Sequence, residues 1–453
     1  MTFAVLTLGV GAYALLQSLV MPVLPTIEVE LGTTQTHVTW VLTAYLLSAS
    51  VFTPIIGRLG DMHGKKRVFV IALAALAVGS LLAALAESLS VMIVARVIQG
   101  IGGGVLPLAF GIIRDEFPKE KVVGAIGLIA ALTSVGAGLG IVLAGPIVTA
   151  LGFRWLFWIP LAMVILAGAA AQILIPESLV RTAGRINWVT AMLMSGWLVA
   201  LLLGVSQAPT SGWGSPVVLG LLAAAAAVAV IWVFVESRSS NPLIDMSMMR
   251  IRSVWAANLV ALLMGIGMYG VFGFLPQFLQ TPLSAGFGFG ASVTESGLML
   301  MPFSAGMFVL GLASGRLAKR LSSRNLVIIG LIVSAIGCFV LAFLHQSRME
   351  IYLATSLAGI GFGIAFSAMS FVVVGAVPAE QTGVASGMNA NIRTIGGSFG
   401  AAFMSGIVTA GFSTSGVPLE AGYVHGFIML GVAVGLGAAA ALLIPVMEAN
   451  KKW

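Results

Sequence analysis

The chain has 453 residues, of which 59% are hydrophobic and only 8% are Asp, Glu, Lys or Arg. Soluble globular proteins carry about 25% charged residues, so this composition excludes a soluble fold and indicates a membrane protein with many spans. The formal net charge is +7. The single cysteine, Cys338, lies in an apolar run, and the four histidines are scattered without metal-site spacing. We therefore expect no disulfide within the chain, no metal and no cofactor.

Apolar runs follow one another along the chain, each about 20 residues long, which is the length that crosses a bilayer core. The first run begins at Thr2 and has no small-residue cleavage site, so it predicts an uncleaved start-transfer helix. The fold class predicted is all-α, with fourteen transmembrane helices. In chain order the runs lie near 2–24, 38–57, 68–87, 90–113, 122–147, 153–175, 187–206, 215–235, 253–280, 295–316, 325–344, 350–376, 383–411 and 424–446.

The basic residues sort by membrane side. Only Arg154 and Arg348 fall in loops of one side, whereas most others fall in the alternate loops or the C-terminal tail. Because positive residues stay on the cytoplasmic side, both termini are predicted to be cytoplasmic, in a bacterial cytoplasmic membrane. The basic excess then needs no nucleic-acid partner. The residues of the basic side are Arg58, Lys65, Lys66, Arg67, Arg114, Lys119, Lys121, Arg181, Arg185, Arg238, Arg250, Arg252, Arg316, Lys319, Arg320, Arg324, Lys451 and Lys452.

Three short segments recur at almost one offset, which indicates an internal duplication. Both copies of the Gly-Arg-Leu loop fall on the same side, so the two halves are related by an axis along the membrane normal. We predict a six-helix bundle over 1–178, two inserted helices with cytoplasmic linkers over 179–250, and a second six-helix bundle over 251–453. The matches are 57–61 with 315–319 at a shift of 258, and 100–102 with 359–361 and Gly124 with Gly383 at a shift of 259.

Repeated halves around a central site indicate a secondary transporter, because rocking one bundle against the other exposes the site to each side in turn. The chain has no GxxxxGK[ST] phosphate loop. The cluster Gly100–Gly104 follows a membrane helix instead of a strand, so it predicts close helix packing and no dinucleotide site. A membrane enzyme would need a mid-membrane catalytic pair, and a receptor or scaffold would need a long soluble segment. Neither is visible.

The loop 57–67, GRLGDMHGKKR, resembles the signature between the second and third helices of the major facilitator superfamily. The segment 96–102, RVIQGIG, resembles that family's second motif. Segments 153–158, 275–280 and 296–302 are similar to the branch with two extra central helices, the drug:proton antiporters. The resemblance implies a monomer in the lipid bilayer that exports small hydrophobic or amphiphilic compounds and uses the proton gradient as its energy source.

Two places depart from that branch. The aspartate expected in the first span is Leu16, beside Gln17 and Ser18, and the antiporter signature has Ile141 where a proline is expected. A dedicated metabolite exporter or an importer of the same superfamily therefore stays open as an alternative. The small residues of these motifs predict close helix contacts; they are Gly100, Gly136, Gly140 and Gly145, with the displaced proline Pro146.

In the resembling family, the first-copy loop latches the two halves in one conformation. Asp61 suits such a latch because a charge-assisted hydrogen bond can be made in one state and broken in the other. The alternative is an ordinary solvated loop. Lys319 replaces the aspartate in the second copy, so that copy is expected to form no equivalent latch. The predicted latch residues are Gly57, Arg58, Asp61, Gly64, Lys65 and Arg67.

Two arginines lie inside apolar runs, where a charge is costly and must face a polar interior. The resemblance links Arg96 to proton coupling, and a structural role holding carbonyls or Gln99 is the alternative. Arg393 follows the amide-rich stretch 388–392, which favours cavity lining or gating over anchoring at a helix end. No carboxylate lies clearly at mid-membrane. The remaining protonatable candidates are Glu28, Glu30 and Glu295, which could equally be solvated rim charges.

The missing mid-membrane carboxylate favours a neutral, anionic or zwitterionic amphiphile over a cation as substrate. One inward proton across about 100 mV supplies roughly 2.3 kcal/mol, enough for a gradient of about fifty-fold in a neutral compound. Met, aromatic and amide side chains are predicted to line the substrate cavity, although each could instead face lipid or pack. They are Gln17, Met268, Tyr269, Gln277, Phe366, Asn389 and Asn391.

Overall fold

The computed structural model describes residues 1–33, 35–38, 40–177, 186–239, 242–318, 320–378, 381–410 and 418–445. These residues form helices and loops without a β-sheet, so the all-α prediction is confirmed. Arg181, Arg185, Lys319, Lys451 and Lys452 of the predicted basic side lie outside the described residues. The helices are α1 (Thr2–Leu19), η1 (Met21–Val23), α2 (Leu24–Glu30), α3 (Gln35–Val38), α4 (Trp40–His63), α5 (Lys65–Ala84), α6 (Leu89–Gly100), η2 (Ile101–Gly104), α7 (Val105–Glu116), α8 (Lys119–Leu151), α9 (Trp155–Leu174), α10 (Trp188–Ser211), α11 (Pro216–Arg238), α12 (Met246–Met249), α13 (Arg252–Gln280), η3 (Leu283–Ala285), α14 (Val293–Leu317), α15 (Ser323–Phe343), α16 (Arg348–Ala376), α17 (Thr382–Val408) and α18 (Glu420–Ala441).

Twelve spans within the described residues are long and apolar enough to cross a membrane, with α6, η2 and α7 joined as one span. The two other predicted spans are α8 and α17, which have 33 and 27 residues and are also long enough. In α17, glycines and the polar residues Asn389, Asn391 and Arg393 lower the apolar content, whereas α8 contains the apolar stretch Gly138–Leu151. The count of fourteen therefore stays a prediction, whereas a multi-pass membrane protein is confirmed.

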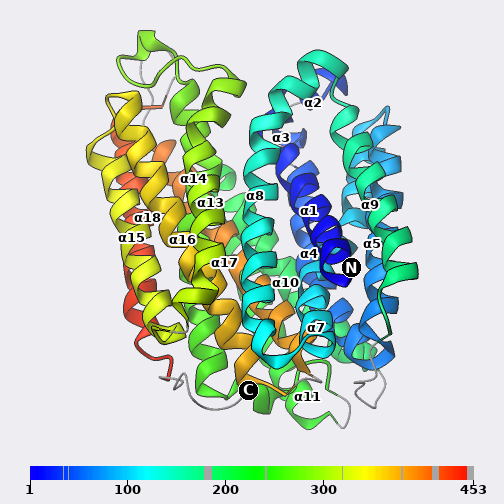
Figure 1. Cartoon of the computed structure of the whole chain (residues 1–453). Coiled ribbons are helices and arrows are strands. Elements are labelled where there is room, and N and C mark those ends of the chain that lie inside the picture. The colour runs from blue at the N-terminus through cyan, green and yellow to red at the C-terminus, as the bar shows by residue number, and fades with distance from the viewer. Residues whose placement is uncertain are drawn as a thin grey trace.

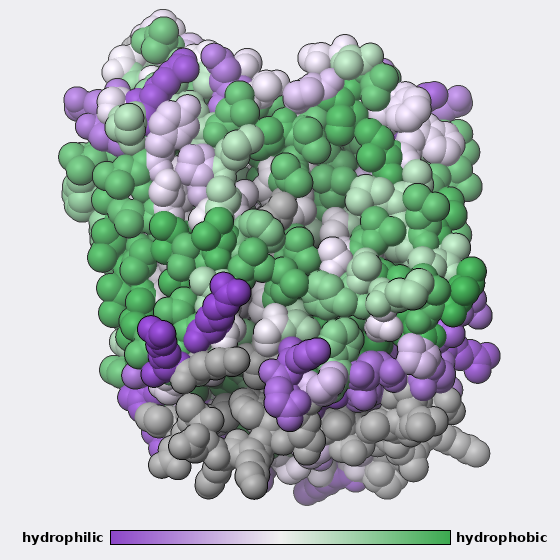
Figure 2. Space-filling model, in the orientation of Figure 1, coloured by the Kyte–Doolittle hydropathy of each residue, from purple (hydrophilic) through white to green (hydrophobic). Residues whose placement is uncertain are grey.

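The first helices and the last helices form two groups that stand side by side in Figure 1, with α5 and α9 at one edge and α15 and α18 at the other. Helices α8 and α14 pack against each other between the groups. Hydrophobic residues form a belt around the middle of the visible face, and hydrophilic residues gather toward its two ends (Figure 2). This distribution matches a bilayer core bounded by two aqueous faces.

The inserted helices α10 and α11 pack on each other, and α10 touches both α4 and α17. Trp213, in the turn between them, stacks on Phe403 of α17 with ring centres 5.4 Å apart. Beyond α11, Asp245 Oδ2 accepts a hydrogen bond from Gln381 Nε2 at 3.3 Å. The insertion therefore lies beside the seam between α4 and α17 and is attached to both ends of α17.

The duplication is visible in the close crossings between the halves. A Cβ atom on Gly57 of α4 would lie 2.7 Å from the carbonyl oxygen of Gly383 in α17. At the equivalent crossing, a Cβ atom on Gly315 of α14 would lie 3.2 Å from the Cα atom of Gly124 in α8. Small residues are needed at both places because they allow two backbones to approach closely. We call the end of the bundle that holds these crossings, together with Arg58, Lys65 and Arg114, the basic end.

The same tight packing recurs inside each half. A Cβ atom on Gly337 of α15 would lie 2.5 Å from the nitrogen of Ala358 and 2.9 Å from the carbonyl oxygen of Ala354, both in α16. Gly79 of α5 meets the equivalent residues of α6 in the first half. Backbone atoms cannot move aside as a flexible side chain can, so an added methyl group must push the helices apart.

We predict that Gly337→Ala lowers the melting temperature of the detergent-purified protein, because overpacking costs about 1–3 kcal/mol. Gly435→Ala in α18 is the matched control, because a Cβ atom there would have nothing within 4 Å. The control should be neutral or slightly stabilising, since glycine lowers helix stability by roughly 0.5–1 kcal/mol. Equal melting temperatures for the two variants would contradict this packing.

Candidate transport cavity and gate

A cavity of about 1060 Å³, part of it continuous with solvent, lies between the two halves. One wall comes from α1, α4, α7 and α8, and the other from α13, α14, α16 and α17. Binding sites for small molecules combine apolar walls with a few polar groups that orient the ligand, and this lining has both. The lining residues are Tyr13, Ala14, Gln17, Ser18, Met21, Tyr45, Leu46, Ala49, Ser50, Thr53, Gly103, Leu106, Thr133, Ile141, Met268, Tyr269, Phe272, Met307, Phe366, Ala390, Asn391, Arg393 and Thr394.

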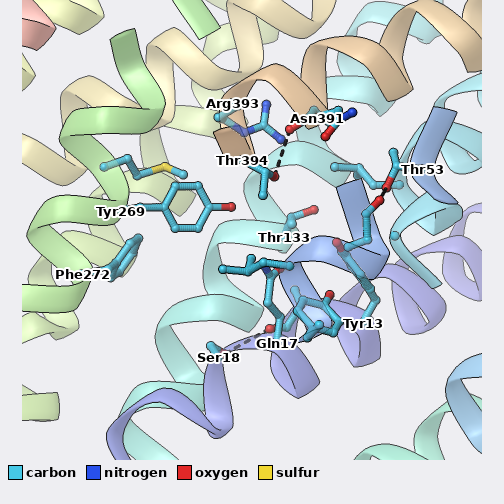
Figure 3. A pocket seen from close by; sticks show the side chains of 18 of the residues that line it. Tyr13, Gln17, Ser18, Thr53, Thr133, Tyr269, Phe272, Asn391, Arg393 and Thr394 are labelled. Carbon is cyan, nitrogen blue, oxygen red and sulfur yellow. Dashed lines mark hydrogen bonds between the residues drawn. The ribbon is translucent and has the colours of Figure 1, made fainter. Parts of the chain in front are cut away.

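The polar groups of the cavity are hydroxyls, amides and one guanidinium. Figure 3 shows Tyr13 and Gln17 on one side of the space, and Tyr269 and Arg393 on the other. Arg393 is the only charged residue among the lining residues, and no carboxylate is among them. A cationic substrate would therefore find no countercharge in this wall.

The structure distributes the predicted cavity residues over three places. Gln17, Met268, Tyr269, Phe366 and Asn391 line the central cavity. The two others lie elsewhere. They are Asn389, which lines a second cavity of about 290 Å³ and donates to Asn258 Oδ1 at 3.0 Å, and Gln277, which is exposed on α13 outside both cavities.

Arg393 separates the two cavities. It lines both of them, as do Leu106, Phe366 and Ala390. Its guanidinium carbon lies 4.4 Å from the centre of the Phe366 ring, a cation–π distance. Arg393 follows Val384, at the start of α17, by nine residues, or roughly 13 Å of helix. The small cavity thus lies between the basic end and the central cavity.

Arg96 lies behind the cavity wall and is fully buried. Its Nε donates to the carbonyl of Val41 at 3.1 Å, and its Nη1 donates to Gln99 Oε1 at 2.7 Å. The Tyr45 ring, which lines the cavity, covers the guanidinium at 4.4 Å. Gln99 in turn donates to Ser80 Oγ at 3.1 Å. These contacts join α4, α5 and α6, as the structural alternative for Arg96 expects.

The second half contains the same carbonyl contact without a charge. At the repeat shift of 259, Thr355 takes the place of Arg96; its hydroxyl donates to the carbonyl of Ile351 in its own helix at 2.8 Å and lies 3.4 Å from the carbonyl oxygen of Met299. Met299 is the counterpart of Val41 at a shift of 258. The second half therefore has only a hydroxyl at this place, and the buried guanidinium is particular to the first half.

At the basic end, Asp61 of α4 caps the N-terminus of α17. Its Oδ2 accepts a hydrogen bond from the backbone N–H of Val384 at 3.2 Å, whereas Gln381, the residue that precedes α17, makes no side-chain cap. The carboxylate is fully buried, with Lys65 Nζ 3.7 Å from Oδ1. Lys65 also pairs with Asp115 at 2.7 Å. The negative charge thus meets the positive end of a helix dipole across the seam.

Arg114 of α7 caps the opposite pole of the neighbouring helix. Its Nη1 donates to the carbonyl of Val374 at 2.7 Å and to Thr382 Oγ1 at 2.6 Å, and its Nη2 donates to the carbonyl of Val377 at 2.8 Å. These carbonyls end α16, where the helix dipole is negative and its last carbonyls lack helical partners. We call Asp61 and Arg114, with the helix ends they bind, the latch.

Sequence reasoning found Asp61 and missed Arg114, because Arg114 was counted only among the loop charges of one side. Its single sequence signal is that it ends an apolar span directly before Asp115. Its partners are backbone carbonyls about 260 residues away, and carbonyls carry no sequence signature.

The comparisons with known proteins give the same architecture. The Major Facilitator Superfamily model matches residues 6–401. The chain belongs to the Major Facilitator Superfamily. This facilitator is accordingly a secondary transporter and not an enzyme.

Relatives of this facilitator are named as multidrug transporters or as resistance proteins. The multidrug resistance protein B homolog of Mycobacterium tuberculosis is 31% identical over 404 residues, covering 86% of this chain and 72% of the relative. The multidrug transporter protein MdtP of Bacillus subtilis is 31% identical over 383 residues, 82% of this chain and 68% of its own. The tetracenomycin C resistance and export protein of Streptomyces glaucescens is 29% identical over 407 residues, which cover 89% of this chain and 74% of that protein.

Solved structures share the fold. The human organic anion transporter MFSD10 has a TM-score of 0.69 at 16% identity and covers 97% of this chain and 98% of its own. The proton:xylose symporter XylE has a TM-score of 0.69 at 14% identity, and the match covers 99% of this chain and 96% of XylE. At such low identities the likeness concerns the fold alone.

The other residues of the predicted latch loop shape the corner between α4 and α5. Gly64 has φ +103°, a backbone conformation that favours glycine, and a Cβ atom there would collide with Glu177. Glu177 Oε2 accepts a hydrogen bond from the backbone N–H of Arg67 at 3.2 Å. Arg58 is buried near Asp61, although its Nε has no hydrogen-bond partner. The loop of this facilitator is thus a packed corner and not a freely solvated one.

The motif glycines bring α8 close to helices of both halves. Gly136 faces Gly11 and Ala14 of α1, with a Cβ position 3.1 Å from the Gly11 carbonyl oxygen. A Cβ atom on Gly145 would lie 2.5 Å from Thr294 Oγ1 of α14. Gly140 of α8 also meets Ser18 and Leu15 of α1. The two other motif residues are Gly100 of α6, which meets Ser48 of α4, and Pro146, which lies inside α8.

The carboxylates considered for proton coupling lie at the end opposite the basic end, outside the lining of the central cavity. Glu30 is exposed and Glu28 is half-buried, both on the short helix α2. Glu295 caps α14 in a reciprocal pair with Ser292 and lies 3.9 Å from Arg348. Their surroundings are those of solvated rim charges, and their role in coupling stays a prediction.

We predict that Asp61→Asn and Arg114→Gln open the basic end. Ser386, buried in the small cavity, is replaced by cysteine as a reporter, and the native Cys338 stays in place because it is fully buried. A hydrogen bond to a charged group contributes about 1.5–3 kcal/mol, so losing one should speed maleimide labelling of the reporter about tenfold or more. Exposed Arg316, the counterpart of Arg58 in the second copy of the loop, gives the control Arg316→Gln. Identical labelling rates in all three variants would show that the latch does not hold this end closed.

Arg96 generates a stability prediction. Arg96→Met removes the charge and leaves Gln99 Oε1 and the Val41 carbonyl without their donor, which costs about 1–3 kcal/mol per buried group. The melting temperature should fall well below that of Arg154→Met, because Arg154 is exposed. If Arg96→Met melts like Arg154→Met, the guanidinium is not a structural tie.

Proposed function

We propose that this facilitator exports hydrophobic or amphiphilic compounds in exchange for protons, with its basic end in the cytoplasm and its opposite end outside a bacterial membrane. The observation that carries the proposal is one largely apolar cavity between two halves whose basic end is latched shut. The positive-inside rule supports this orientation, because the loops of that end hold most of the basic residues. The described state is then closed to the cytoplasm.

The relatives support the choice of drugs over a single metabolite. Three of them carry names that refer to multidrug resistance or antibiotic export at about 30% identity over more than four-fifths of this chain. The cavity fits a broad substrate range because Met21, Met268 and Met307 adapt their shape, and Phe272 and Phe366 offer flat apolar surfaces.

Asp61 is the group through which a proton would act on the gate. A protonated carboxyl would lose its Coulombic attraction to Lys65 and to the N-terminus of α17, because both attractions require the negative charge. The α4–α17 seam could then separate while each half keeps its internal packing. Proton uptake would thereby favour the state that is open to the cytoplasm, and proton release would favour the described state.

We predict that everted vesicles containing the protein accumulate a neutral aromatic ester when a proton gradient is imposed, and that a protonophore abolishes the accumulation. Asp61→Asn should reduce the initial rate about tenfold or more, because it removes the charge that makes the two states respond to protons. Glu30→Gln, at the exposed opposite end, should leave the rate unchanged. Accumulation no greater than in empty vesicles, or accumulation that survives the protonophore, would refute proton-driven export.

A further inference from the structure

We propose that Arg393 is an anion-binding group and that the preferred substrates are aromatic amphiphiles with a single carboxylate. The inference rests on the proposed export function and names its substrate class. Arg393 is the one charged residue in the lining of the central cavity, and 9% of its surface is exposed. No Asp or Glu side chain of the described residues lies within 4.0 Å of its guanidinium. Its Nε has no hydrogen-bond partner.

An arginine in this position is costly without a partner. Burying a charge is unfavourable unless it is paired, and the cation–π contact with Phe366 at 4.4 Å, together with the neighbouring phenol of Tyr269, offsets only part of that cost. A bound anion would supply the missing countercharge. Among organic anions, a carboxylate matches the planar guanidinium because it accepts two parallel hydrogen bonds.

Asn391 gives a second, independent sign of a ligand. It lines the same cavity two residues before Arg393 on α17, is buried, and neither its amide nitrogen nor its amide oxygen has a hydrogen-bond partner. Buried polar atoms are almost always satisfied, so an unsatisfied amide facing a cavity calls for a ligand or water. Figure 3 shows Asn391, Arg393 and Tyr269 around one side of the space. An anion bound to Arg393 would lie near the amide of Asn391 and the phenol of Tyr269, which line the same cavity.

The rest of the cavity suits an aromatic body. Met268, Phe272, Met307 and Ile141 form apolar parts of its wall. Such a site favours a molecule with one anionic end and one apolar end over a dication, because the lining holds one cation and no carboxylate.

The position of Arg393 between the cavities extends the inference to the path. Because Arg393 lines both the central cavity and the small cavity toward the basic end, a carboxylate that enters from the basic end meets the guanidinium before it reaches the central cavity. The same cation can hold the anion while the halves rock around it. The competing role is purely structural, in which Arg393 only packs on Phe366 and gates the passage.

Binding of three fluorescent probes with one pyrene body separates these roles. The probes are 1-pyrenebutyrate, its methyl ester and 1-pyrenebutylamine, measured with the purified full-length protein in lipid nanodiscs. The carboxylate should bind about tenfold or more tightly than the ester, since hydrogen bonds to a charged partner are worth that factor, and the amine should bind weakest. Arg393→Gln should remove the preference and leave ester affinity within about threefold, a margin that corresponds to less than 1 kcal/mol. Arg393→Lys keeps the charge but loses the planar guanidinium with its two parallel donors, so its preference for the carboxylate over the ester should be intermediate.

Arg348→Gln is the matched control, because Arg348 is exposed at the other end of the molecule and should keep the full preference. Equal binding of carboxylate and ester by the unaltered protein would overturn the inference, as would equal weakening of both probes in Arg393→Gln and Arg393→Lys. A transport measurement with the same probes distinguishes failure of the anion site from failure of the proposed export function. If the protein binds the carboxylate preferentially but everted vesicles move no probe, export is wrong and the anion site stands. If vesicles move ester and carboxylate alike, with Arg393→Gln matching the unaltered protein, export stands and the anion site is wrong.

Discussion

Charges from one half that cap helix ends of the other half are the interaction on which this state depends. Asp61 binds the N-terminus of α17 and Arg114 binds the C-terminus of α16, so each charge meets the helix pole of opposite sign. Both helix ends lack complete caps of their own, and both would be left unsatisfied if the halves separated. These charges therefore stabilise the closed seam. Loss of one of them would weaken it, as a two-state gate requires.

The glycine crossings make this capping geometrically feasible. Gly57 and Gly383 bring the backbones of α4 and α17 close enough for the Asp61 carboxylate to reach a backbone N–H directly. The equivalent crossing of Gly315 and Gly124 lies where the second copy of the loop carries no aspartate. The fold is thus symmetric in its packing, whereas its charges are asymmetric. One seam is held by a buried carboxylate, whereas the other is a close helix contact.

The cavity and the latch lie on the same helix, which connects substrate and gate. Along α17, Val384 receives Asp61, Asn389 lines the small cavity, and Asn391 and Arg393 line the central cavity. A rigid helix transmits a displacement at one end to the other, so a ligand held on Arg393 and a carboxylate that caps Val384 act on one element. The turn between α10 and α11 contacts one end of this helix through Trp213, and the segment after α11 contacts the other end through Asp245. Helix α10 lies beside the seam between α4 and α17.

The sequence by itself determined the membrane class, the apolar spans, the duplication and the family, because each depends on composition, periodicity or a local motif. It also indicated that Asp61 is a latch residue and that Arg393 faces a polar interior. Tertiary structure alone decided what each charge binds. Arg114, counted at first only as a loop charge, caps α16 through carbonyls far along the chain, and Arg96 lies behind Tyr45 on partners of its own half. The physical reason is that backbone carbonyls and helix poles are the same for every sequence, so only the folded arrangement shows which of them a charge will meet.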